Sequence, residues 1–103
     1  MRIHQWLKIL AQGKGSDLFL ATGAPPCAKF AGELKTIAPD VLAPGEVATI
    51  ADEIMDDTQR EEFARELEMN LALFLPGIGR FRVNIFRQRN EVSIVSRFIV
   101  SEI

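Results

Sequence analysis

The sequence is poor in cysteine and histidine, and it has no long apolar run. Its 103 residues include one cysteine, Cys27, and one histidine, His4. A single cysteine cannot form an internal disulfide and suits a reducing cytosol, and no Cys/His cluster for a metal is encoded. The apolar runs are far shorter than the ~20 residues that span a bilayer. We therefore expect no disulfide, no metal site and no membrane insertion.

Catalytic and targeting motifs are also missing. There is no GxxxxGK[ST] phosphate-binding loop, and Gly13–Ser16 lacks the full spacing and precedes a predicted strand instead of a helix. The N-terminal residues contain polar interruptions and no small-residue cleavage site, so we do not interpret them as a signal peptide. The chain alone is thus not expected to be a complete enzyme.

Charge is distributed unevenly along the sequence. The net charge of −2 argues against nucleic-acid binding. Ten acidic residues lie between positions 40 and 68, against only Arg60 and Arg65. The segment from Leu71 onward contains no lysine and five arginines, namely Arg80, Arg82, Arg87, Arg89 and Arg97. The sequence therefore predicts an acidic helical part beside a cationic sheet part.

Hydrophobic periodicity predicts three helices. Apolar residues recur at helical spacing over 3–10 and over 47–55. A third helix is predicted after Asp57, with Thr58 and Glu61 forming a capping box.

The other segments read as strands joined by turns. We predict strands over 17–21, 28–31, 34–37, 69–75, 80–87 and 92–100, with a hairpin turn at Gly32-Glu33, a further turn over 88–91 and the last three strands as an antiparallel meander. The fold class is therefore α+β, an antiparallel sheet with helices packed on one face in a PAS-like arrangement, and residues 1–103 form a single domain.

The stretch from Gly79 to Arg89 carries the clearest functional pattern. Phe81, Val83 and Ile85 alternate with Arg80, Arg82 and Asn84, which places an apolar row and a cationic row on opposite faces. The planar guanidinium group binds phosphate or carboxylate with two parallel hydrogen bonds. Such an arginine, held on a rigid strand, suits a phosphoryl group bound by another domain. A solvated strand face with salt bridges to the acidic segment is the alternative.

Three segments resemble one known family. Residues 16–26 (SDLFLATGAPP), 54–63 (IMDDTQREEF) and 77–89 (GIGRFRVNIFRQR) are similar, in this order, to motifs of the PilT/PilU family of type IV pilus retraction motors. The resemblance runs over essentially the whole chain.

The resemblance implies a larger protein. Members of this family are hexameric ATPases in which a PAS-like N-terminal domain precedes a RecA-like ATPase domain. The chain resembles the N-terminal domain alone. Implied partners are the RecA-like domains of the same and neighbouring subunits and the pilus inner-membrane platform protein. ATP and Mg²⁺ would bind only in the parent protein, which would be cytoplasmic and peripheral at the inner membrane.

The resemblance also assigns roles to arginines. Arg82 and Arg97 match positions that face the ATP phosphates, while Arg80, Arg87 and Arg89 could contact a neighbouring subunit. The family usually has a basic residue after the position of Arg97, where this chain has Phe98. A PilT-like and a PilU-like parent both remain open.

Two other functions compete with this one. A stand-alone PAS-like sensor or interaction module would need an internal pocket, for which Ala28, Ala31 and Ala72 could leave room. Nucleic-acid binding through the arginines ranks last because the chain is acidic overall and has no exposed aromatic residues predicted beside them.

Overall fold

The computed structural model describes residues 1–100 as one six-stranded sheet with three helices. The predicted domain, residues 1–103, thus extends three residues beyond the described part. The helices are α1 (His4–Gln12), α2 (Glu46–Ile54) and α3 (Asp57–Glu66). The strands are β1 (Asp17–Leu20), β2 (Cys27–Phe30), β3 (Glu33–Thr36), β4 (Glu68–Leu75), β5 (Gly79–Gln88) and β6 (Glu91–Ile99).

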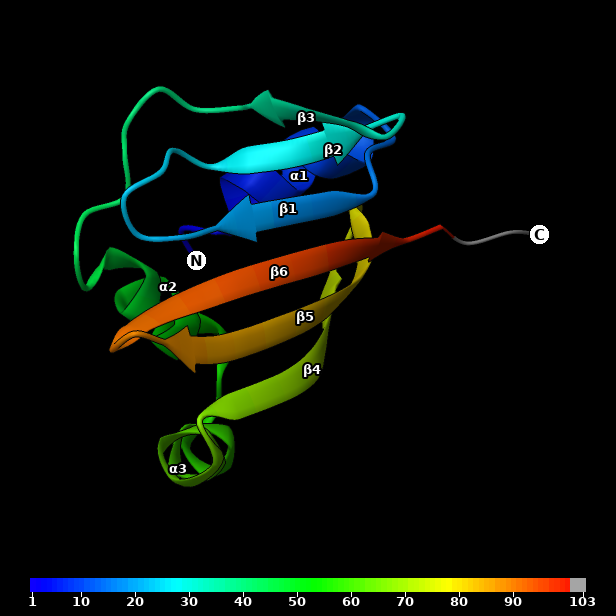
Figure 1. Ribbon diagram of the computed structural model, residues 1–103. Helices are drawn as coiled ribbons and strands as arrows, with labels where there is room; N and C mark the ends of the chain where they lie inside the picture. Colours follow the sequence, from blue (N-terminus) through cyan, green and yellow to red (C-terminus); the bar gives the residue numbers. More distant parts are fainter. Residues whose placement is uncertain (101–103) are drawn as a thin grey trace.

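The sheet is antiparallel throughout, in the order β3-β2-β1-β6-β5-β4. The meander β4–β5–β6 is as predicted. The first hairpins of the chain join it through β1, which pairs with β6, so the N-terminal and C-terminal strands meet at the centre of the sheet (Figure 1). This pairing places residues some eighty positions apart in the sequence side by side.

The helices bury one face of the sheet. Trp6, Leu7 and Leu10 of α1 and Ile50 of α2 pack with Phe81 and other apolar strand residues in a single core. Phe63 is the buried residue of α3, so this helix also contributes to that core. The α+β class with helices on one face is therefore confirmed. No helix in the described residues is long and apolar enough to cross a membrane.

The start of α3 differs from the prediction. The N-cap is Asp56, whose side chain accepts a hydrogen bond from the Gln59 backbone N–H at 2.8 Å, while the Gln59 side chain accepts one from Asp56 N–H at 2.9 Å. The capping box expected at Thr58 and Glu61 is thus wrong by two residues. The reason is that the helix begins at Asp57, so Asp56 has the extended backbone of an N-cap residue (φ −83°, ψ 177°) and Thr58 already lies within the helix.

Two hairpins close through left-handed two-residue turns. Ala31 and Gly32 have φ of 53° and 79° between β2 and β3, one residue before the predicted turn. Arg89 and Asn90 have φ of 54° and 65° between β5 and β6. Positive φ at both central residues matches the strand twist and fixes the register of the pair.

Candidate anion-binding face

The face of the sheet opposite the helices, here called the open face, carries the cationic row of β5. Arg80, Arg82 and Asn84 point to it, while Phe81 and Val83 point into the core, with 0% and 1% exposure. Alternate residues of β5 therefore face the core and the open face, as the sequence predicts.

Arg82 and Arg97 lie directly opposite each other. The register of β5 and β6 pairs their Cα atoms, so both side chains leave the open face at neighbouring positions. Side chains so placed start about 5 Å apart, and like charges in this arrangement destabilise a sheet. An anion bound between or beside the two arginines would relieve this repulsion.

The arginines differ in their contacts. Arg97 Nε donates to Asp17 Oδ1 on β1 at 3.3 Å, and the Arg97 side chain is still 72% exposed. The Arg80 guanidinium lies over the ring of Phe74, with Cζ 5.6 Å from the ring centroid. Among the described residues, the side chain of Arg82 makes no hydrogen bond or ion pair. The alternative of arginines paired with the acidic segment of residues 40–68 is therefore not what the structure shows for Arg82 or Arg97.

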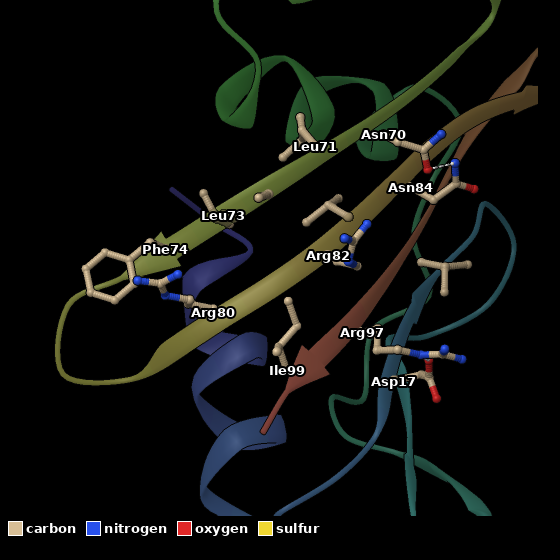
Figure 2. Close-up of a pocket in the computed structure, with 13 residues that line it drawn as sticks. Asp17, Asn70, Leu71, Leu73, Phe74, Arg80, Arg82, Asn84, Arg97 and Ile99 are labelled. Carbon is tan, nitrogen blue, oxygen red and sulfur yellow. Dashed lines mark hydrogen bonds and ion pairs between the residues drawn. The ribbon is translucent and has the colours of Figure 1, made fainter. Parts of the chain in front are cut away.

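These side chains line a groove of about 560 Å³ on the open face, here called the arginine groove. Figure 2 shows Arg80, Arg82 and Arg97 along it, with Asp17 beside Arg97 and with Asn70 bonded to Asn84. Its lining has three arginines and one carboxylate. The groove therefore has a local excess of positive charge, although the whole chain is acidic.

Arg87 and Arg89 lie away from this groove. Arg87 is at the far end of β5, where its Nη1 donates to the Asn90 carbonyl at 3.3 Å, and Arg89 is in the following turn. Seven residues of strand separate Arg80 from Arg87, which is roughly 23 Å at 3.3 Å per residue. The structure thus separates Arg80 from Arg87 and Arg89, which the sequence grouped as one interface set.

The three alanines that could leave room for an internal ligand pocket do not lie together. Ala28 is buried in the core, Ala31 is in the β2–β3 turn, and Ala72 is exposed on β4. They therefore lie at three separate places of the structure. In residues 1–100, no group of three His, Cys, Asp or Glu side chains is arranged to hold a metal ion.

Asp17 is the site residue that sequence reasoning missed. It stands at the start of a short buried strand, and its partner Arg97 is eighty residues away. No local sequence pattern predicts an ion pair between residues so far apart. The opposition of Arg82 and Arg97 does have a signal, because the turn expected over 88–91 is centred between Arg89 and Asn90, and counting outward from that centre pairs Arg82 with Arg97.

Known proteins are similar to this chain in sequence and in fold. The chain is 37% identical over all 103 residues to the type IV pilus ATPase PilU of Pseudomonas aeruginosa, and 35% identical to the type IV pilus retraction ATPase PilT of that bacterium. It superposes on a crystal structure of the pilus retraction motor PilT with bound ADP, with a TM-score of 0.81 and 29% identity over 94% of this chain and 29% of that one. The chain belongs to the PilT/PilU family.

Within the PilT/PilU family, the chain corresponds to the N-terminal domain. It spans 27% of the length of PilU and 30% of the length of PilT. No family model matches it. The resemblance stated from the three sequence motifs is thereby confirmed, and the open face described above belongs to this domain.

Proposed function

We propose that the chain is the N-terminal domain of a hexameric type IV pilus retraction ATPase and that Arg82 and Arg97 contact the ATP phosphates. The observation that carries the proposal is the cross-strand opposition of these two arginines on the open face. Two like charges held side by side on a rigid hairpin form a preorganised anion site. The ADP in the similar PilT structure supports a nucleotide as the ligand.

The domain would act with a RecA-like ATPase domain. The open face has no covering layer from residues 1–100, and Phe74 and Val100 beside the arginine groove are 60% and 68% exposed. Exposed apolar side chains beside cationic ones suit packing against a second domain that holds an anionic ligand. Pilus disassembly and twitching motility would be the resulting activity.

The lining of the arginine groove suits ATP phosphates better than Mg²⁺. The one carboxylate that lines the groove, Asp17, is engaged with Arg97. The metal ion would therefore be held by the ATPase domain. The parent protein would be cytoplasmic and would meet the inner membrane through the pilus platform protein.

Arg80, Arg87 and Arg89 would contact neighbouring subunits. Their positions at two ends of β5 imply two separate contacts instead of one. Arg80→Ala would weaken self-association of the full-length protein in sedimentation experiments. The contact made by Arg87 and Arg89 would stay intact in this variant.

The proposal is tested in the full-length protein. Arg82→Ala and Arg97→Ala are each expected to lower the turnover number for ATP, by up to about 10³- to 10⁵-fold if the arginine stabilises transition-state charge. Arg65→Ala is the matched control because Arg65 is exposed on α3, away from the open face, and its ion-pair partner among the described residues is Glu66, at 3.6 Å. The unfolding temperature of each variant checks the fold.

A lysine variant tests whether the positive charge of the arginine is enough or whether the geometry of its guanidinium group is also needed. Arg82→Lys keeps the positive charge but loses the two-pronged donor, so it should recover only part of the lost rate. An unchanged turnover number in both alanine variants would refute the proposed role of the arginines.

A further inference from the structure

The pair of Asp17 and Arg97 is asymmetric in its exposure to water. The Asp17 side chain is 13% exposed, whereas the Arg97 side chain is 72% exposed. The two residues are also direct cross-strand partners in the β1–β6 register, so their backbones hold them at a fixed separation. A largely covered carboxylate on a central strand thus anchors the base of a side chain that reaches into solvent.

The contact uses only one edge of the guanidinium group. Arg97 donates from Nε at 3.3 Å, and among the described residues Nη1 and Nη2 have no partner. These two nitrogens form the terminal fork that binds two phosphate oxygens in parallel. Asp17 therefore restrains the planar group and leaves its phosphate-binding edge unoccupied.

Asp17 lies among cationic residues, whose mutual repulsion its carboxylate reduces. Arg82 is opposite Arg97 on one side, and Lys29 is opposite Asp17 on the other, in the β1–β2 register. Without Asp17, the three cations would repel one another with no compensating charge in the groove lining. Figure 2 shows the Arg97 side chain directed toward Asp17.

We propose that Asp17 is a positioning residue that fixes the orientation of the Arg97 guanidinium for phosphate contact. The inference rests on the proposed function, since it concerns how one of the two arginines performs it. Asp17 touches neither ATP nor the reacting atoms. It acts through Arg97 alone, and its removal leaves Arg97 charged but free to adopt other rotamers.

The test is a double-mutant cycle in the full-length protein. Turnover number and KM for ATP are measured for the wild type, Asp17→Asn, Arg97→Ala and the variant with both changes. We expect Asp17→Asn to lower the turnover number by up to about 10²-fold, as misplacement of a catalytic group does, with a smaller change in KM. In the Arg97→Ala background the same substitution should have no further effect.

Glu68→Gln is the matched control. Glu68 also lies on the open face, where its carboxylate accepts from Asn84 Nδ2 at 3.4 Å. The substitution removes the same charge from the same face, away from Arg97, and should leave the turnover number unchanged. Unfolding temperatures of all variants detect a loss of rate that comes from unfolding.

Each outcome decides between the two proposals. If Arg97→Ala leaves the turnover number unchanged, the proposed function of Arg97 fails and the role of Asp17 fails with it. If Arg97→Ala lowers it while Asp17→Asn does not, or lowers it equally in both backgrounds, only the inference about Asp17 is overturned. A turnover number that rises in Asp17→Asn would also overturn it, because Asp17 would then restrain Arg97 from its ligand.

Discussion

Ser96 places a hydroxyl group in an otherwise apolar core. It is 0% exposed, and its Oγ has no hydrogen-bond partner in residues 1–100. Its register partners on both sides, Leu18 of β1 and Val83 of β5, are apolar and buried. A buried hydroxyl without a partner loses its hydration and gains nothing in return.

We expect Ser96→Ala to stabilise the chain, by about 1 kcal/mol, because it removes this unsatisfied group at little change in volume. Ser93→Ala, on the same strand but at a half-buried position of the open face, should change the free energy of unfolding much less. Urea unfolding of both variants measures the difference. A clear loss of stability in Ser96→Ala would show that the hydroxyl has a partner after all.

The residues of the open face show what a sequence can and cannot reveal. Alternation along β5 predicted which side chains point away from the core, because a strand has a period of two whatever it pairs with. The ion pair of Asp17 with Arg97 could not be predicted, because it depends on β1 pairing with β6 across the whole chain. The local sequence pattern thus predicts which face of the sheet a side chain points to. Its partner on the adjacent strand depends on long-range strand pairing.

At the scale of elements, the predicted helices and strands occur, and their boundaries differ in places. The segment from Asp56 to Glu61 contains two overlapping capping patterns, Asp56 with Gln59 and Thr58 with Glu61. Either pattern satisfies the rule for a helix start. The structure decides between them because the helix begins at Asp57: Asp56 is extended, as an N-cap residue must be, and Thr58 already lies within the helix.

This gives a direct comparison of two substitutions in α3. Asp56→Ala should lower the free energy of unfolding by about 1 kcal/mol, because it removes the hydrogen bond to Gln59 N–H. Thr58→Ala should have little effect, because Thr58 is an exposed residue within the helix. Chemical denaturation of the two variants would contradict the capping seen here if the Thr58 variant were the less stable one.

The start of α2 carries a carboxylate, Glu46, that is held by two donors. Glu46 accepts a hydrogen bond from the Ala43 N–H at 2.7 Å and pairs with Arg2 Nη1 at 2.6 Å. The Ala43 backbone N–H, followed by Arg2, holds the pKa of Glu46 below its ordinary range. A carboxyl group whose pKa is lowered by folding adds stability above its unfolded pKa, about 4.3 for glutamate, and loses it as the pH falls through the folded value.

We therefore expect Glu46→Gln to lower the unfolding temperature at pH 6, with the difference from the wild type shrinking as the pH falls below the unfolded pKa of about 4.3. Glu62→Gln serves as the control because Glu62 is an exposed carboxylate of the neighbouring helix α3. Thermal unfolding followed by circular dichroism at several pH values gives both curves. A difference that stayed constant over this range would rule out the ionised Glu46 as its source.

At the scale of the whole molecule, one side chain connects three distant segments. Glu91, just after the β5–β6 turn, accepts hydrogen bonds from Thr22 Oγ1 at 2.9 Å and from Gly45 N–H at 3.2 Å. Thr22 follows β1, and Gly45 is the N-cap of α2, so the carboxylate also faces the positive end of that helix. The meander, the first hairpins and α2 thus meet at Glu91.

Glu91→Ala should lower the free energy of unfolding by about 1–2 kcal/mol, because two donors lose their partner. Glu91→Gln retains an acceptor oxygen and should lose less. Thr22→Ala, which removes one of the two donors, provides a reference for the size of a single contact. Equal midpoints for the wild type and the alanine variant in urea would contradict this role.

The separation of the arginine groove from the core has a genetic consequence. The helices and the core lie on one side of the sheet, and the arginine side chains of the groove point to the other. A substitution at Arg82 or Arg97 would therefore yield a folded protein that accumulates to a normal level. If the parent protein assembles with itself as proposed, such alleles would be incorporated beside normal subunits and would behave as dominant, whereas alleles that damage the core would be degraded and recessive.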